Sequence, residues 1–478
     1  MKIKNGFKYE INGWKYISIS GKPYERGFAH GKLLKKEIKK CISTMKWNLY
    51  NDYGFDARFF TLVSNYVFKK YIEDHYPEYY SELHGIANGS KSKIDEIILW
   101  NNYASLPYAL SSIKDNLHNM STLMKEYGDI LENVDAFGSI MEGGSSDKCS
   151  AFMAVGDYTH DGKICCAHNS FDDFITGQYF NVIIDIKPNK GNRILFQSAP
   201  GYISSQTDFF ITSNGFIGTE TTFGGFNNYI QGSPISCRIR SCMQYAKTLD
   251  DYISILKKHN SGDYANAWLI GNTNTNEIMR IELGLEFVNV EKKKNGYFIG
   301  FNAPYDPRIR NIESSNTGFD DIRRHQGARK VRLEQLMDKN KGKINIDIAK
   351  NIIADHYDVY LNKDNKCSRT ICSHYELDAR EYMSQADRPL PYAPRGAVDG
   401  CVADTKLCKN MSFYGRWGSS CGTPFIVKDY IKKNMQWKRY QPYLNDRPSQ
   451  PWTLFTINKK NTRHNKTNRI KRKKNTHE

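Results

Sequence analysis

The sequence contains no run of about 20 apolar residues, the length that a membrane-spanning helix needs. Residues 1–21, MKIKNGFKYEINGWKYISISG, carry basic side chains but lack the continuous apolar stretch that forms the centre of a signal peptide. The sequence therefore predicts a soluble protein without a conventional secretion signal, and it assigns no compartment.

Cysteine is too scarce for a dense disulfide scaffold, with 11 in 478 residues, and the odd number leaves at least one unpaired. Cys367, Cys372 and His374 lie together in CSRTICSH, but this segment lacks a second pair at the spacing of a zinc site. The sequence therefore predicts no metal and no other cofactor. Cys165 and Cys166 lie in an apolar run and are expected in the core, because free cysteine packs as a small hydrophobic residue.

The net charge of +17 is unevenly spread along the chain. Residues 458–478, NKKNTRHNKTNRIKRKKNTHE, are almost wholly polar and basic, so they cannot bury apolar surface to offset their ordering entropy. We expect a disordered tail whose charge allows weak contact with nucleic acid or an anionic surface. No nucleic-acid-binding fold signature accompanies it, and a tail that only aids solubility explains its composition equally well.

At 478 residues and 55.1 kDa the chain exceeds the usual size of a single core, so two lobes or one large elaborated domain are expected. There is no internal repeat and no coiled-coil pattern. Helical spacing of apolar residues dominates before a Gly- and Ser-rich loop at 136–147. This spacing predicts helices at 24–48, 58–74, 78–88 and 93–110, and we expect the part before Cys149 to hold only helices.

The pattern changes to strands at Cys149. A hairpin of two strands, CSAFMAVGDY and ICCAH, is predicted around the turn THDGK. Further strands are predicted at 180–187, 193–198, 208–213, 216–220, 266–271, 277–283 and 296–301, with helices at 234–258, 319–338 and 345–356. A run of strands with helical blocks predicts a layered α+β fold.

Cys149 is the candidate nucleophile, because it follows the flexible loop at the start of a strand. A cysteine needs a proton acceptor to be thiolate at neutral pH. If the peptide bond before Cys149 is cut, its new α-amino group, with an ordinary pKa near 8, lies within reach of its own sulfur. One residue then supplies both nucleophile and base. A buried core cysteine at a strand start is the ordinary alternative.

Several motifs in a fixed order carry a family resemblance. They are GKPYERGFAHG (21–31), LHGIANG (83–89), DKCSAF (147–152), AHNSFDDF (167–174), APGYISSQTDFFITSNGFIGTETTFG (199–224), NSGDYANAWLIG (260–271), PRGAVDGCVADTKL (394–407) and WGSSCG (417–422). Together they resemble the phospholipase B-like proteins and the acyl-CoA:penicillin acyltransferase (peptidase C45) group of N-terminal-nucleophile hydrolases. The resemblance covers residues 18–430.

This resemblance implies an N-terminal-nucleophile αββα sandwich, in which two mostly antiparallel sheets are stacked between helices. It implies a mainly helical segment 1–148 that is cleaved off but stays associated, and a strand-rich catalytic part 149–457 that starts at the nucleophile; the composition adds the tail 458–478 as a third part. The implied activity is hydrolysis of an acyl ester or amide bond, in a phospholipid or an N-acyl substrate. With an acceptor amine in place of water, the same site would be an acyltransferase.

The resemblance also assigns site residues. Cys149 matches the nucleophile and His168 the histidine that faces it, whereas Asn169 stands where the lipase-like relatives more often have an aspartate. Asn266 matches the asparagine whose amide holds the oxyanion. Thr221 and Thr222 are expected to line the substrate pocket, although alternating threonines are ordinary in a strand. The arginine of the family's site stays unassigned among Arg308, Arg310 and Arg395.

Two other readings remain. Residues 418–422, GSSCG, fit the G-x-S-x-G nucleophile elbow of α/β-hydrolases, but the only histidines after Ser420 are His464 and His477, both in the expected tail. The chain could also be a relative that no longer turns over and serves a structural or binding role. The departure at Asn169 favours that reading, and the retained Cys149 opposes it.

Overall fold

The computed structural model describes residues 1–110, 120–132, 148–205, 207–226, 228–315, 318–378 and 393–457. The predicted loop at 136–147 and the basic tail at 458–478 lie outside these described residues.

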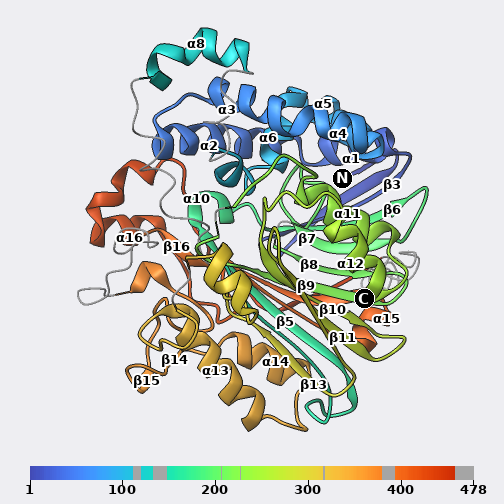
Figure 1. Ribbon diagram of the computed structural model, residues 1–478, viewed down its shortest axis with the longest axis vertical. Helices are drawn as coiled ribbons and strands as arrows, with labels where there is room; N and C mark the ends of the chain where they lie inside the picture. The colour runs from blue at the N-terminus through green and yellow to red at the C-terminus, as the bar shows by residue number, and fades with distance from the viewer. Residues whose placement is uncertain are drawn as a thin grey trace, which may run out of the picture.

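Two stacked β-sheets form the centre of the molecule (Figure 1). The larger sheet has ten strands, in the spatial order β1 (Lys2–Ile3), β2 (Gly6–Ile11), β3 (Trp14–Gly21), β6 (Val182–Pro188), β7 (Ile194–Ser198), β8 (Phe209–Thr212), β9 (Phe216–Thr222), β10 (Asn266–Asn272), β11 (Glu277–Leu283) and β12 (Val288–Lys293). Its neighbours pair antiparallel except β3 and β6, which are parallel.

The smaller sheet runs β13 (Gly296–Gly300), β4 (Cys149–Gly156), β5 (Gly162–Asp173), β17 (Asp399–Asp404), β18 (Ser412–Trp417) and β19 (Thr453–Thr456). The short strand β16 (Arg395–Ala397) pairs with the end of β5. A separate two-stranded ribbon consists of β14 (Tyr357–Asp358) and β15 (Lys363–Asp364). Strands β4 and β13 contact the facing strands β10 and β11, so the two sheets pack directly on one another.

Helices cover both outer faces of this pair of sheets (Figure 1). On the side of the larger sheet lie α1 (Pro23–Leu33), α11 (Ile235–Tyr245) and α12 (Leu249–Lys257), and on the side of the smaller sheet lie α13 (His325–Lys339) and α14 (Ile346–Ile353). The predicted α+β sandwich of helices and two stacked, mostly antiparallel sheets is therefore confirmed.

The described residues form further helices. They are α2 (Lys35–Tyr53), α3 (Ala57–Ser64), η1 (Asn65–Lys69), α4 (Lys70–His75), α5 (Pro77–Ser90), α6 (Ile94–Asn101), α8 (Ser121–Glu132), α10 (Phe174–Gly177), η3 (Ile309–Glu313), η4 (Tyr375–Leu377), α15 (Thr405–Lys409), α16 (Val427–Lys433) and η5 (Met435–Tyr440). Among the described residues, no helix combines the length and apolar character that a bilayer crossing requires.

The expectation that the part before Cys149 holds only helices is wrong. Strands β1 to β3 precede the first helix, and β3 lies inside the larger sheet between β2 and β6. In β3 the apolar residues Trp14, Tyr16, Ile17 and Ile19 are buried, while Lys15 and Ser18 are only partly covered. Because lysine and serine lie between the apolar residues, the composition of this segment does not predict a buried strand.

Helices α1 and α5 cross at unusually close range, and glycines make this possible. A Cβ atom on Gly27 would lie 2.0 Å from the carbonyl oxygen of Glu82, and one on Gly31 would lie 2.2 Å from that of Ile86. Conversely, a Cβ on Gly85 would lie 2.3 Å from the carbonyl oxygen of Tyr24. The motifs GFAHG and LHGIANG are thus the two halves of one helix contact.

Charged side chains close the same contact. The buried carboxylate of Glu82 on α5 accepts hydrogen bonds from Arg26 Nε of α1 at 2.6 Å and from Arg240 Nη2 of α11 at 3.0 Å. A buried carboxylate shared by two guanidinium groups is satisfied in charge and in hydrogen bonding. This network fixes three helices on the larger sheet.

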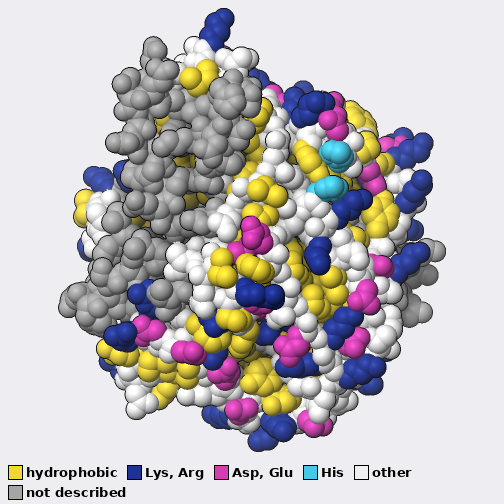
Figure 2. All heavy atoms as spheres, in the orientation of Figure 1, with side chains coloured by type: hydrophobic (Ala, Val, Ile, Leu, Met, Phe, Trp, Pro, Cys, Tyr) yellow, Lys and Arg dark blue, Asp and Glu magenta, His cyan; other side chains and the backbone are white. Residues whose placement is uncertain are grey.

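The inner strands of the sandwich are apolar throughout rather than alternating. In β4 every residue from Cys149 to Val155 is buried, because one face meets the larger sheet and the other is covered by helices. Cys165 and Cys166 in β5 are both buried, as predicted. On the face of the described residues in Figure 2, basic and acidic side chains are interspersed among apolar ones.

Candidate active site

Cys149 is the first residue of β4, an inner strand of the smaller sheet, and its side chain is 3% exposed. Its sulfur lies 4.0 Å from Glu220 Oε1 on β9, and its backbone N–H donates to Asn302 Oδ1 at 3.3 Å. Burial raises the pKa of the Cys149 thiol well above its usual value, and the carboxylates of Glu220 and Asp208 raise it further. In the uncut chain the thiol is therefore neutral.

The two carbonyl groups around Cys149 are each held by a donor. The carbonyl oxygen of Lys148 accepts a hydrogen bond from the N–H of Phe171, and that of Cys149 accepts one from Arg329 Nη1 at 2.6 Å. Arg329 Nη2 also donates to Asn302 Oδ1 at 2.8 Å. The peptide units on both sides of Cys149 are thus each held through their carbonyl group.

Arg329 reaches this site, and no motif in the sequence singles it out. It lies on α13 and is fully buried, with its guanidinium 5.1 Å from the centre of the Phe171 ring. Burial lowers the pKa of Arg329 to about 10, so it remains a cation at neutral pH.

The three arginines considered from the sequence have other contacts. Arg308 pairs with Asp306, Arg395 pairs with Asp173, and Arg310 donates to the backbone carbonyls of Pro304 and Tyr305.

Glu220 and Asp208 form a buried acidic pair beside the thiol. The hydroxyl of Tyr264 lies 2.9 Å from Glu220 Oε1 and 3.2 Å from Asp208 Oδ2, and it accepts a hydrogen bond from Thr222 Oγ1 at 3.0 Å. Burial raises the pKa of Asp208 to about 6 and that of Glu220 well above its usual value. Two neighbouring buried carboxyl groups cannot both ionise easily, so the pair retains a proton near neutral pH.

His168 lies on β5, where Ala151 of β4 is its direct cross-strand partner. It therefore shares the face of the sheet on which Cys149 lies, one diagonal step away. Neither ring nitrogen makes a hydrogen bond of good geometry to the described residues. Burial lowers the pKa of His168 to about 3, with the Glu220 backbone offsetting only part of this, so the imidazole is neutral.

Asn169 points away from the thiol. It pairs with Ser150, so its side chain lies on the opposite face of the sheet from that of Cys149. Its amide nitrogen donates to the carbonyl oxygens of Ile353 and Ile371 at 2.7 and 3.1 Å and to Ser420 Oγ at 3.1 Å. Asn169 therefore ties loops to the back of β5, and the departure from aspartate removes no charge next to the sulfur.

Asn266 opens β10 directly opposite Thr222 of β9. Its amide oxygen and nitrogen are both buried and make no hydrogen bond to any of the described residues. Thr222 offers its carbonyl oxygen to Asn302 Nδ2 at 2.6 Å, and Thr221 lies against Gly300 of β13. A buried amide without a partner costs free energy unless a ligand satisfies it.

The nucleophile-elbow reading does not fit the fold. The GSSCG segment follows strand β18, but the next helix, α16, begins only at Val427 rather than at the turn. The hydroxyl of Ser420 is buried and donates to the carbonyl oxygen of Ile353 at 2.7 Å. Ser420 is a structural residue here.

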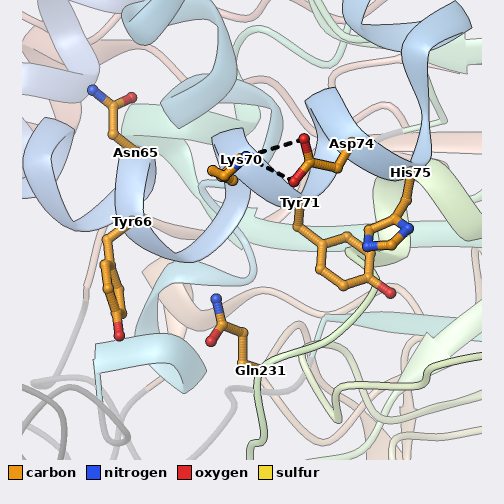
Figure 3. Close-up of a pocket in the computed structure, with 7 residues that line it drawn as sticks. All are labelled: Asn65, Tyr66, Lys70, Tyr71, Asp74, His75 and Gln231. Atoms are coloured by element: carbon orange, nitrogen blue, oxygen red, sulfur yellow. Dashed lines mark hydrogen bonds and ion pairs between the residues drawn. The ribbon is translucent and has the colours of Figure 1, made fainter. Parts of the chain in front are cut away.

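Two surface hollows lie elsewhere on the molecule. One, of about 350 Å³, lies on helices η1 and α4 next to Gln231, where Lys70 pairs with Asp74 and the Tyr71 ring packs against His75 (Figure 3). The other, of about 320 Å³, is lined by residues that include Lys15, Lys36 and Asn445. Neither includes Cys149.

Comparison with known sequences assigns this chain to a family. The family model described as phospholipase B matches residues 4–447. The chain therefore belongs to the phospholipase B family.

Individual relatives are distant. The chain is similar to a phospholipase B of Crotalus adamanteus, 26% identical over 47% of this chain and 43% of the relative, and to phospholipase B-like 1 of Homo sapiens, 24% identical over 54% and 48%. These matches span about half the length of the curated relatives. A mutant conjugated bile acid hydrolase from Clostridium perfringens aligns over 56% of this chain and 89% of its own, at 13% identity, but its TM-score of 0.33 is too low to bear on the fold.

Proposed function

We propose that this protein is a hydrolase that cuts its own chain before Cys149 and then uses the Cys149 thiol to hydrolyse an acyl ester or amide bond. The observation that carries this proposal is the geometry around one peptide bond. The Lys148 carbonyl is held by the N–H of Phe171, and the N–H of Cys149 faces Asn302 Oδ1.

Self-cleavage would begin with attack of the Cys149 sulfur on the carbonyl carbon of Lys148. The N–H of Phe171 would stabilise the negative charge that develops on the oxygen. As the C–N bond breaks, the thiol proton passes to the leaving nitrogen and a thioester forms. Water then hydrolyses the thioester, which frees the thiol and leaves a new α-amino group on Cys149.

The acidic pair of Glu220 and Asp208 is placed to assist the proton transfer. Glu220 Oε1 lies 4.0 Å from the sulfur. The pair retains a proton near neutral pH, so it can take up the thiol proton and pass it on to the leaving nitrogen while one carboxyl group stays neutral.

In the processed protein, the α-amino group beside Asn302 Oδ1 would serve as the base for its own thiol. The sulfur attacks the acyl carbon of the substrate, and the leaving group takes the proton as its bond to that carbon breaks. Water then attacks the thioester, which releases the acyl group as a carboxylic acid and returns a proton to the sulfur. The buried, unpartnered amide of Asn266 would donate to the oxyanion. Neutral His168, with Thr221 and Thr222, would line the acyl site, whereas Asn169 supports it from the far face of the sheet.

Substrates of this site are proposed to be phospholipids or N-acyl compounds, in keeping with the family. An acceptor amine in place of water would make the same thioester an acyl donor, which is the acyltransferase alternative. The third reading, a silent structural relative, requires none of this chemistry.

The deciding experiment is the intact mass of the purified protein under denaturing, reducing conditions, beside Cys149→Ala and the control Cys165→Ala. We expect two fragments, with the second beginning at Cys149, in the wild type and the control, and one chain in Cys149→Ala. Processed protein is then assayed with phospholipids and N-acyl amides, with and without an added amine. An uncut wild-type chain that releases no acyl group would support the silent reading instead.

A further inference from the structure

Four potential metal-binding side chains converge at one place outside the Cys149 site. The ligand atoms of His356, Cys372, His374 and Cys421 all lie within 4.8 Å of one another. They come from separate segments: His356 follows α14, Cys372 and His374 precede η4, and Cys421 follows β18. A chain brings two cysteines and two histidines together from such distant positions only through its fold.

The set differs from the one considered in the sequence. Cys367 is not part of it, because its sulfur lies 3.4 Å from Asp358 Oδ2, in a separate contact. His356 and Cys421 replace it, and their distance along the chain from CSRTICSH explains why no zinc pattern was visible.

Two distances from His374 match those around a tetrahedral ion. His374 Nε2 lies 3.5 Å from Cys372 Sγ and 3.4 Å from Cys421 Sγ. With zinc bonds of about 2.3 Å to sulfur and 2.0–2.1 Å to nitrogen, tetrahedral geometry separates a sulfur and a nitrogen by about 3.6 Å. These two sulfur–nitrogen distances are therefore within one or two tenths of an ångström of the tetrahedral value, and all four ligand atoms lie within 4.8 Å of one another.

The hydrogen bonds around His374 and Cys421 also resemble those around metal-binding residues. His374 Nδ1 lies 2.8 Å from Glu376 Oε1, so the carboxylate fixes the ring and leaves Nε2 free to bind. The N–H of Thr423 donates to Cys421 Sγ at 3.3 Å. His356 Nε2 is buried and makes no hydrogen bond to the described residues.

We propose that His356, Cys372, His374 and Cys421 bind one zinc ion in a closed structural site. Two thiolates and two imidazoles fill a tetrahedral shell, which leaves no position for water or substrate. Cys372 and His374 are buried and the other two ligands half-buried, as expected for an ion that holds segments together. Binding releases the two thiol protons to solvent.

The zinc site would lie next to residues that contact the Cys149 site. Cys372 packs with Phe171 and Ala397 in one apolar cluster, and Cys421 packs against it. The backbone of Phe171 holds the Lys148 carbonyl. The zinc would therefore fix two loops onto the end of β5, independently of whether Cys149 is catalytic.

The test begins with the wild-type protein, purified without chelator and dialysed, and its zinc content is measured by elemental mass spectrometry. We expect about one zinc per chain in the wild type and in the control Cys408→Ser, and less than a tenth of that in Cys421→Ser and His356→Ala. Zinc retained at full occupancy in Cys421→Ser and His356→Ala would overturn the proposal. So would a wild-type protein that holds no zinc and takes up none from equimolar ZnCl2.

A second measurement does not depend on the variants folding. Wild-type protein stripped and reloaded with Co²⁺ should show the visible absorption of tetrahedral cobalt with thiolate charge-transfer bands. Their absence would contradict the site. The competing arrangement is a disulfide between Cys372 and Cys421, and its detection by peptide mass mapping without reductant would also overturn the proposal.

Discussion

Arg329 Nη1 donates to the carbonyl oxygen of Cys149 at 2.6 Å, across 180 positions of sequence. The same guanidinium holds Asn302 Oδ1, which faces the Cys149 nitrogen. Arg329 is therefore a positioning residue, because it orients the nucleophile's backbone without touching the sulfur.

We expect Arg329→Lys to slow both self-cleavage and turnover by roughly 100-fold, because a lysine keeps the charge but loses the fork that joins two acceptors. Fragment formation over time, read by gel or mass, measures the first effect. The control is Arg332→Lys, about one turn further along the same helix, whose partner is Asp355. Equal cleavage rates in the Arg329 and Arg332 variants would contradict the assignment.

Asn266→Ala tests the proposed oxyanion donor. Loss of one such donor costs about 100- to 1,000-fold in kcat in other enzymes, and KM should change far less because the contact forms in the transition state. Kinetics on processed protein give both constants. Asn272→Ala, at the other end of β10, is the matched control and should leave kcat unchanged. A rise in KM alone would show that Asn266 only binds the substrate.

Asp399 makes stability depend on pH near neutrality. It accepts hydrogen bonds from the Ser170 N–H at 2.9 Å and from Gln197 Nε2 at 2.8 Å, yet burial raises its pKa from 3.8 to about 7. The folded protein thus holds a proton that the unfolded chain loses near pH 4. This stabilisation is complete below about pH 4 and is lost as the pH rises through about 7.

We therefore expect the melting temperature of the wild type, relative to Asp399→Asn, to fall as the pH rises from about 4 to 8. The full difference corresponds to about 4 kcal/mol at 1.36 kcal/mol per pKa unit. Scanning calorimetry of both proteins across this range measures it. A difference independent of pH would show that Asp399 is ionised throughout.

Gly85→Ala should destabilise the protein, because its Cβ would lie 2.3 Å from the carbonyl oxygen of Tyr24 and 2.7 Å from the N–H nitrogen of Phe28. Such crowding between helices costs about 1–3 kcal/mol. Gly128→Ala on α8 is the control, since its Cβ would only meet Met124 Cε at 3.6 Å. Thermal unfolding should show a lower midpoint for Gly85→Ala alone, and equal midpoints would mean that α1 and α5 move apart freely.

Periodicity is sufficient to predict most strands of the part that begins at Cys149. The strands around Cys149, His168 and Asn266 were predicted from apolar runs, because strands buried on both faces are apolar throughout. The first three strands were missed, because β3 mixes lysine and serine with its apolar residues. Its burial depends on pairing with β6, which lies more than 150 residues further along the chain.

The site was less accessible to sequence reasoning than the fold. Glu220 lies in the motif GTETTFG, and a glutamate inside an otherwise apolar and threonine-rich strand is a sequence signal for a buried functional carboxylate. Arg329 and Asn302 carried no such signal, because their proximity to Cys149 depends on how α13 and the turn after β13 pack. Contacts between residues far apart in the chain determine the geometry of the site, and they produce no local sequence pattern.

The parallel pairing of β3 with β6 has a consequence for a chain cut before Cys149. Strand β3 would then belong to one polypeptide and β6 to the other, with seven residue pairs between them in the interior of a single sheet. The product would be an obligate heterodimer whose subunits share one sheet and cannot fold separately. Its two polypeptides would migrate apart only in denaturant and would elute together from a sizing column at the mass of the uncut protein.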